Sequence, residues 1–282
     1  MKLAWITGSN GLIGNYVVRS AGQFASQWRV RPLTRPQLDI LDFKSVEREF
    51  NADRPELIIH CAAISTVAEA QRNPALAKRL NVEATQFLAE LASGIQFAFF
   101  STDIIFDGRK GNYNETETPN PLHAYGESKL GAEQIVLRNP RHLVIRTSIN
   151  GGISRSGNRG FNEQLRAALE SGRGMKLFTD EFRCPIFAGE TARAVWELAG
   201  RDCSGIFHVA GAEKLSRYQI GQLLLRRWPE LKTKIEPGLA KDFPGPPRAL
   251  DVSLDISKVQ KVLGKPLAGL SEWLASNPEE PF

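Results

Sequence analysis

Three glycines near the N-terminus constrain the fold of this chain more than any other feature. They lie in the run Thr7-Gly8-Ser9-Asn10-Gly11-Leu12-Ile13-Gly14, between an apolar segment at residues 3–6 and a stretch with apolar residues at helical spacing. A strand, a glycine turn and a helix in this order are typical of dinucleotide-binding sites. Gly8 permits the tight turn, Gly11 lets the backbone approach a pyrophosphate, and Gly14 lets the helix pack closely on the strand. The alternative is an ordinary glycine-rich turn without a ligand.

The composition is that of a globular protein with a large core. The 282 residues are 42% hydrophobic and 24% charged, and the formal net charge of +5 is modest for this length. No basic run indicates a nucleic-acid partner. Three scattered cysteines do not make a disulfide framework or a metal site, which favours a reducing compartment. Because no segment is long enough for a membrane span or a signal peptide, we expect a cytoplasmic protein without a membrane partner.

Apolar strands alternate with helical patterns along the first half of the chain, which predicts an α/β protein with a Rossmann-type doubly wound parallel sheet. We expect residues 1–150 to form an NADP(H)-binding domain and residues 151–282 to form mainly a smaller α/β substrate lobe. Some later segments, at about residues 187–210, are expected to return to the main sheet. The strands predicted in the first half lie at residues 28–33, 56–63, 96–100 and 141–147, and the helices at residues 43–50 and 66–93, with a break at Asn73-Pro74.

The segment after the second predicted strand bears on cofactor choice. It reads Leu33-Thr34-Arg35-Pro36, with no acidic residue before Asp39. An acidic residue near this point binds the ribose 2′-hydroxyl of NAD, whereas a nearby arginine suits the 2′-phosphate of NADP. The sequence therefore favours NADP(H) with Arg35 on the phosphate, while NAD(H) stays possible. The alternative for Arg35 is a surface residue without a ligand.

The fourth predicted strand stops at Ser101-Thr102-Asp103, and a later helix opens with Tyr125 and Lys129 on one face. A phenol with a pKa near 10 is a poor proton donor or acceptor at neutral pH. We expect the Lys129 ammonium and an oxidised nicotinamide to lower the pKa of Tyr125. Thr102 can hydrogen-bond a carbonyl oxygen. The pattern predicts a cofactor that supplies hydride and a protein that supplies the proton.

These stretches together resemble the extended short-chain dehydrogenase/reductases, and within them the dTDP-4-dehydrorhamnose reductase group. The resemblance covers residues 1 to about 150 and extends more thinly to about 255. It is carried by the glycine motif and by Leu38-Asp39-Ile40, Ala62-Ala63, Asn81-Val82, residues 101–108, residues 125–133 and Arg146-Thr147-Ser148.

The resemblance implies a role for each matching residue. Tyr125 would be the proton donor, Lys129 its partner and a ribose ligand, and Thr102 the group that orients the carbonyl. A helix-interior packing residue with a local hydrogen bond is the alternative for Asn81, and a structural or surface arginine is the alternative for Arg248. The implied substrate contacts are Asp103, Ser148 and Arg248. The implied cofactor contacts are Gly8, Asn10, Gly11, Leu12, Ile13, Gly14, Arg35, Asp39, Ile40, Ala62, Ala63, Ser65, Asn81, Ser101, Tyr125 and Lys129.

The sequence departs from the group's pattern where the substrate is expected. Residues 149–152 stand in place of Trp-Val-Tyr, so an aromatic wall is absent or supplied elsewhere. The usual Asp-Gln-x-x-x-Pro-Thr appears as residues 180–186, which places an extra acid, Glu181, and an arginine, Arg183, near the expected pocket. Arg248 stands where Arg-Pro is usual and could hold a substrate diphosphate.

The sequence predicts an NADP(H)-dependent reductase of a 4-keto sugar nucleotide or a similar ketone. One alternative is a sugar-nucleotide epimerase that retains its nicotinamide, and the other is a non-catalytic, cofactor-binding regulatory subunit. The substrate is expected to be a small molecule, a nucleotide-diphosphate sugar in the first reading. The resemblance implies a homodimer through helices near residues 66–93 and 125–138.

Overall fold

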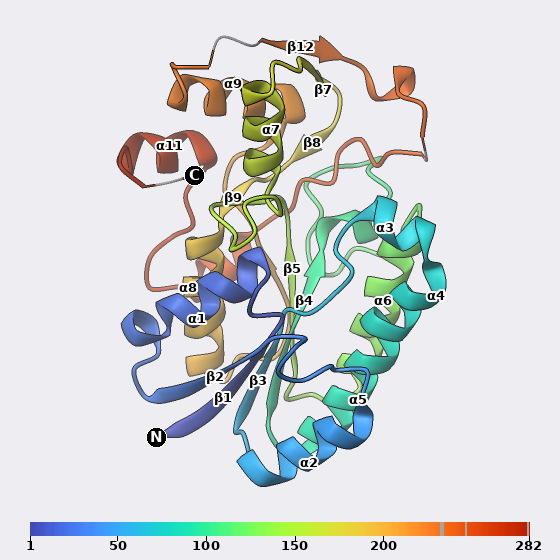
Figure 1. Cartoon of the computed structure of the whole chain (residues 1–282), viewed down its shortest axis with the longest axis vertical. Helices are drawn as coiled ribbons and strands as arrows, with labels where there is room; N and C mark the ends of the chain where they lie inside the picture. Colours follow the sequence, from blue (N-terminus) through green and yellow to red (C-terminus); the bar gives the residue numbers. More distant parts are fainter. Residues whose placement is uncertain (232–233, 246, 281) are drawn as a thin grey trace.

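The chain is organised around a six-stranded, fully parallel sheet in the order β2-β1-β3-β4-β5-β10. A computed structural model describes residues 1–231, 234–245, 247–280 and 282. Figure 1 shows the sheet in the lower half of the molecule, covered by helices on both faces. The prediction of a doubly wound parallel sheet is confirmed. Its strands are β1 (Lys2–Thr7), β2 (Trp28–Leu33), β3 (Leu57–His60), β4 (Gln96–Thr102), β5 (Leu143–Thr147) and β10 (Gly205–Val209).

Alternate residues of the central strands enter two separate cores, as expected for strands buried on both faces. In β1, Ala4 and Ile6 pack toward α1 (Leu12–Phe24) and α8 (Ala188–Gly200). Leu3 and Trp5 pack toward the opposite layer. That layer is formed by α2 (Phe43–Asp53), α5 (Ala84–Leu91) and α6 (Ala124–Val136).

Residues that follow the fifth strand by about 40 positions return to the main sheet. The pairing of β10 with β5 is parallel, with Gly205 opposite Leu143 and Val209 opposite Thr147. The preceding helix, α8, packs on α1, where the indole Nε1 of Trp196 donates a hydrogen bond of 2.9 Å to the carbonyl of Val17. The first layer of helices therefore combines the beginning of the chain with its last third.

The helical run after β3 is broken where the sequence predicts a break, at Asn73. The run comprises α3 (Val67–Arg72), α4 (Pro74–Lys78), a π-helical turn (Arg79–Glu83) and α5. The Asn73 side chain caps α4 by accepting a hydrogen bond from the Leu76 amide at 3.0 Å. A π-helical turn inserts an extra residue and is common near functional sites. Here it contains the fully buried Asn81.

The smaller lobe has a core of its own, built from α7 (Phe161–Glu170), α9 (Arg217–Arg227) and α11 (Leu270–Ser276). Figure 1 shows these helices at the end of the molecule that lies beyond the carboxyl ends of β4 and β5. The described residues also form three two-stranded sheets. The remaining elements are β6 (Asn150–Gly151), β7 (Met175–Phe178), β8 (Phe182–Arg183), β9 (Ile186–Phe187), β11 (Leu215–Ser216), β12 (Ile235–Gly238), α10 (Ser257–Gln260) and short 3₁₀ turns at residues 92–94, 103–105 and 240–242.

In the described part of the chain, no helix is long and apolar enough to cross a membrane. The same residues contain no group of three or more histidine, cysteine, aspartate or glutamate side chains arranged to hold a metal ion.

Candidate functional site

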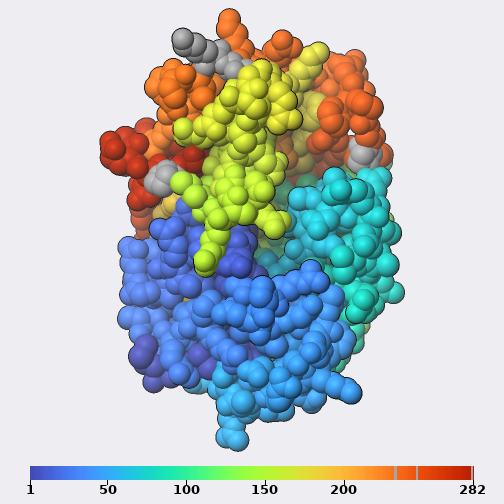
Figure 2. All heavy atoms as spheres, in the orientation of Figure 1, coloured from blue at the N-terminus to red at the C-terminus, as the bar shows by residue number. Residues whose placement is uncertain are grey.

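A cavity of about 680 Å³ lies where the main sheet meets the smaller lobe. It opens at the carboxyl ends of β1, β3, β4 and β5, where ligands bind in open α/β sheets. In Figure 2 the surface is hollowed between the blue N-terminal residues, the cyan helical run and the yellow-green segment of the smaller lobe. The strand ends that the sequence singled out therefore face one shared space.

The glycine turn forms the floor of this cavity and has no room for side chains. Gly8 has a positive φ of 63°, and a Cβ on it would lie 2.6 Å from the Ala62 nitrogen. A Cβ on Gly14 would lie 2.4 Å from the Gly8 carbonyl oxygen. Gly11 is the N-cap of α1 and brings no side chain to its exposed amides. A helix N-terminus left open in this way suits a pyrophosphate, so the turn fits a dinucleotide.

Nineteen of the twenty predicted site residues line the cavity. The exception is Asn81, whose side chain bonds both the amide (2.9 Å) and the carbonyl (3.1 Å) of Ile64 and the hydroxyl of Ser128 (2.9 Å). Asn81 thus ties the loop after β3 to α6 from behind. The Ser101 hydroxyl, by contrast, lines the cavity and is buried without a hydrogen-bond partner among the described residues. An unpaired buried hydroxyl of this kind is suited to a ligand.

Arg35 lies at the adenosine end of the predicted cofactor site. Its side chain is 81% exposed, and its Nε is 3.5 Å from the Asp39 carboxylate. Both residues line the cavity, together with Ile40. A solvent-facing ion pair of this kind contributes little to stability, so the guanidinium is free to turn toward an anion.

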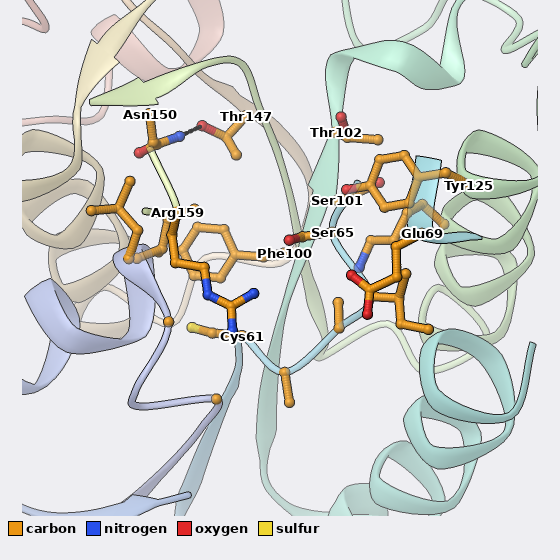
Figure 3. A pocket seen from close by; sticks show the side chains of 18 of the residues that line it. Cys61, Ser65, Glu69, Phe100, Ser101, Thr102, Tyr125, Thr147, Asn150 and Arg159 are labelled. Carbon is orange, nitrogen blue, oxygen red and sulfur yellow. Dashed lines mark hydrogen bonds between the residues drawn. The ribbon is translucent and has the colours of Figure 1, made fainter. Parts of the chain in front are cut away.

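Tyr125, Lys129 and Thr102 all line the cavity. Figure 3 shows the Tyr125 ring and the Thr102 side chain together on one side of the cavity, with Ser101 and Ser65 beside them. The helix that carries Tyr125 begins at Ala124, and the ring of its N-cap residue, His123, accepts a hydrogen bond from the Gly126 amide. Tyr125 and Lys129 therefore come from consecutive turns of α6, and Thr102 comes from the end of β4.

The expected sign of the Tyr125 pKa shift is wrong for this structure. Burial raises the pKa of the phenol well above its usual value, and the Asp103 carboxylate raises it further, while a hydrogen bond with Thr102 lowers it. The prediction relied on the charges of Lys129 and of an oxidised nicotinamide and left out desolvation. The consequence is a phenol that keeps its proton at neutral pH, which suits a proton donor.

Lys129 is itself strongly perturbed by burial. Its side chain is 3% exposed, and its Nζ lies 3.9 Å from the centre of the Phe99 ring. Burial lowers the pKa of Lys129 to about 7, although the Glu133 carboxylate opposes the shift. The amine is consequently divided between its charged and neutral forms near neutral pH.

This burial predicts a pH-dependent stability in the absence of cofactor. Above pH 7 the folded chain binds fewer protons at Lys129 than the unfolded chain, so the free energy of unfolding rises with pH. Between about pH 6.5 and 8.5 the deprotonation of Lys129 should raise the free energy of unfolding by about 2 kcal/mol. Lys129→Met should remove that increment in urea unfolding, whereas Lys44→Met, at an exposed site, should retain it. Equal pH dependence in parent and Lys129→Met would contradict the assignment.

Asp103 links Thr102 to Ser148 and Arg183 within the lining of the cavity. Its carboxylate accepts hydrogen bonds from the Thr102 hydroxyl at 3.2 Å and from the Ser148 hydroxyl at 2.6 Å, and it lies 3.7 Å from Arg183 Nε. Burial raises the pKa of Asp103, while Arg183 and Ser148 counteract that shift. Asp103 and Ser148 therefore hold each other in place in the lining of the cavity.

The far end of the cavity is lined by a charged wall, formed by Glu181, Arg183, Arg217 and Arg248. Glu181 lies at its centre and pairs with all three arginines. Although burial raises the pKa of Glu181, these guanidinium groups hold it at about 2. The sequence placed Glu181, Arg183 and Arg248 near the pocket, and the structure agrees. It also brings in Arg217, which no motif indicated.

Arg159 is a second cavity residue that sequence analysis missed. It precedes α7 in an exposed loop of the smaller lobe. In Figure 3 its side chain reaches into the cavity opposite Tyr125, near Phe100 and Cys61. The only sequence signal was a basic residue within a run of Gly, Ser and Asn, which is too common to single out.

A buried ion pair fixes the helix that carries Tyr125 and Lys129. The Arg146 guanidinium, on β5, contacts both oxygens of Glu133, on α6, at distances of 2.8–3.2 Å. Their side chains are 3% and 1% exposed. Glu133 lies one helical turn beyond Lys129, so the pair locks the register of α6 against the sheet.

Comparison with known families and curated proteins gives consistent matches. The family described as the RmlD substrate binding domain matches residues 1–277. The "Probable low-salt glycan biosynthesis reductase Agl14" of Haloferax volcanii is 32% identical, over 97% of this chain and 96% of that protein. The methionine adenosyltransferase 2 subunit beta of Danio rerio is 30% identical, over 76% of this chain and 70% of that protein.

Solved structures show the same architecture. A dTDP-4-dehydrorhamnose reductase from Clostridium acetobutylicum superposes with a TM-score of 0.88 at 26% identity, covering 98% of both chains. The enzyme of that name from Bacillus anthracis, solved in complex with NADP, gives a TM-score of 0.89 at 23% identity, also covering 98% of both chains. The similarity thus extends over the main sheet and the smaller lobe together.

Proposed function

The chain belongs to the RmlD substrate binding domain family, and from that membership we propose that it is an NADP(H)-dependent reductase of a 4-keto sugar nucleotide. The observation that carries the proposal is the shared cavity. The glycine turn, which fits a dinucleotide, and the Tyr125, Lys129 and Thr102 side chains all line it. A bound cofactor and a bound carbonyl could therefore meet beside a proton donor.

The residues of the chain then have distinct tasks. NADPH, when bound, supplies the hydride. The Tyr125 hydroxyl gives its proton to the carbonyl oxygen, and burial keeps that hydroxyl protonated until the oxygen becomes basic. The Thr102 hydroxyl, by turning its proton from Asp103 to the substrate, donates a hydrogen bond that orients the same oxygen. Lys129 stabilises the phenolate that Tyr125 becomes after it has given up its proton. The Ser101 hydroxyl, which has no hydrogen-bond partner among the described residues, can bind a ligand.

A panel of keto-sugar nucleotides, assayed by the absorbance of NADPH, tests the proposal. We expect stoichiometric NADPH oxidation with at least one 4-keto compound. Turnover of a sugar nucleotide without net NADPH consumption would instead identify an epimerase. Tight NADPH binding without turnover of any panel member would contradict a catalytic role.

A cofactor-binding subunit is the second candidate function. The relative from Danio rerio is named as a subunit of methionine adenosyltransferase, which favours this candidate. The placement of Tyr125, Lys129 and Thr102 in one cavity supports the enzyme instead, because a structural subunit has no need of a proton donor beside the glycine turn.

The cofactor preference is tested by Arg35→Ala. Loss of the guanidinium should weaken NADPH binding by about tenfold and leave NADH binding unchanged, because only NADPH has a 2′-phosphate. The dissociation constants can be measured by fluorescence titration. Arg109→Ala, at a distant exposed arginine, is the matched control and should bind both cofactors as the parent does. Parental NADPH affinity in Arg35→Ala would remove Arg35 from the cofactor site.

A further inference from the structure

Glu181 is fully buried within the charged wall and has both carboxylate oxygens engaged. Its Oε1 accepts a hydrogen bond from Arg217 Nε at 2.9 Å and lies 3.2 Å from Arg183 Nη2. Its Oε2 accepts a hydrogen bond from Arg248 Nη1 at 2.7 Å. Glu181 therefore has no oxygen to offer a substrate and can act only through the arginines.

Arg183 is occupied by the protein itself. Its Nη1 donates to the carbonyls of Phe182 at 2.9 Å and Ala249 at 3.1 Å, and its Nε faces Asp103. Its side chain is 6% exposed. Arg183 thus joins Asp103 to the charged wall but does not present an open edge to the cavity.

Arg217 and Arg248 differ from Arg183 because each bonds Glu181 through a single guanidinium nitrogen. Arg217 uses Nε and Arg248 uses Nη1, and their other guanidinium nitrogens have no hydrogen bond to the described residues. Aromatic rings pack against both guanidinium groups. The guanidinium carbon of Arg217 lies 5.0 Å from the centre of the Phe161 ring, and that of Arg248 lies 4.6 Å from the centre of the Phe178 ring. Both arginines line the cavity.

We propose that Glu181 is a positioning residue that holds Arg217 and Arg248 as a paired binding site for two adjacent anionic groups of the substrate. Guanidinium forks match phosphoryl oxygens, and a diphosphate carries two such groups. The inference rests on the proposed function and deepens it. It assigns the substrate end of the same cavity to a molecule that carries a diphosphate, and it adds Arg217 to that end.

The positioning role can be separated from a simple charge effect by its sign. If Glu181 only neutralised the arginines, then Glu181→Gln would make the wall more positive and tighten anion binding. If Glu181 positions them, then Glu181→Gln weakens binding, because an amide has one acceptor oxygen and turns its N–H groups toward a guanidinium. Glu181→Asp keeps the negative charge but has a shorter side chain that no longer reaches the arginines. A positioning role therefore predicts that this variant also binds anions more weakly.

The experiment is a calorimetric titration of the full chain with inorganic pyrophosphate and with UDP. The protein is first saturated with NADP⁺, so that the glycine turn is filled and the titrant reports the substrate end. We expect Glu181→Gln, Glu181→Asp, Arg217→Gln and Arg248→Gln each to bind both anions about tenfold more weakly. Arg226→Gln, an exposed position on the same helix, is the matched control and should keep the parental affinity.

Four results would overturn the inference. They are no binding of either anion by the parent, parental or tighter binding by Glu181→Gln, parental binding by the Arg217→Gln/Arg248→Gln double variant, and preference for glucuronate, a carboxylate, over both phosphates. The double variant decides the matter if the Glu181 variants fail to fold. Because binding is measured and not turnover, a protein that reduces no keto sugar could still satisfy this test, and the two proposals fail separately.

Discussion

Replacing Tyr125 with Phe is expected to lower turnover of the best panel substrate by about 10²–10⁴-fold. Phenylalanine fills the same buried space but has no hydroxyl, so the carbonyl oxygen loses its proton donor while the wall of the cavity keeps its shape. NADPH affinity should stay near the parental value, since the glycine turn is untouched. The measurement is the initial rate of NADPH oxidation at saturating substrate.

The matched control for this change is Tyr113→Phe. Tyr113 is as buried as Tyr125, stacks on Phe106, and donates its hydroxyl to Asp107 at 2.9 Å, but it does not line the cavity. Its loss should affect stability by about 1 kcal/mol and leave turnover unchanged. Comparable rates for Tyr125→Phe and the parent would remove the phenol from the chemistry.

Glu133→Gln should lower the free energy of unfolding by about 3–5 kcal/mol, as measured by urea denaturation. The substitution keeps the shape of the side chain but leaves the guanidinium of Arg146 buried without a counter-charge. Because α6 carries both Tyr125 and Lys129, the loss of the Glu133–Arg146 ion pair should also make the positions of these two side chains less well fixed. The Lys129 pKa should fall further, since Glu133 is the largest of the groups that raise it.

Two further variants make this prediction specific. Glu127→Gln lies on the same helix at an exposed position and should change stability by less than about 1 kcal/mol. The double variant Glu133→Leu/Arg146→Met removes both charges and should recover most of the lost stability, because paired burial of charge gains little over apolar packing. A single variant as stable as the parent would show that the ion pair is dispensable.

The main sheet could be predicted because its signals are local. Apolar runs such as residues 3–6 and 96–100 mark strands that are buried on both faces, and the glycine motif marks the first turn. Since all parallel strands end at the same edge, the polar residues after them had to converge. Thr102 ends β4, Ser65 and Ser148 follow β3 and β5, and all three line one cavity.

The charged wall could be predicted only in part. Glu181 and Arg183 were visible as departures from a known pattern, but Arg217 starts a helix more than thirty residues later. Arg217 lies beside Glu181 because β11 pairs with β8, with Leu215 opposite Arg183, and each of these strands has only two residues. Strands this short show no periodicity in the sequence. The sign of the Tyr125 pKa shift was missed for a related reason, because the depth of burial depends on the assembled structure.

The return of β10 and α8 to the sheet has a consequence for how this protein can be made. During synthesis the first 150 residues leave the ribosome with the inner face of α1 uncovered and one edge of β5 unpaired, until Trp196 and residues 205–209 emerge. Three-quarters of the chain must therefore be translated before the main sheet can close. A gene truncated after residue 150 should yield insoluble protein, so the two halves cannot be exchanged as separate modules.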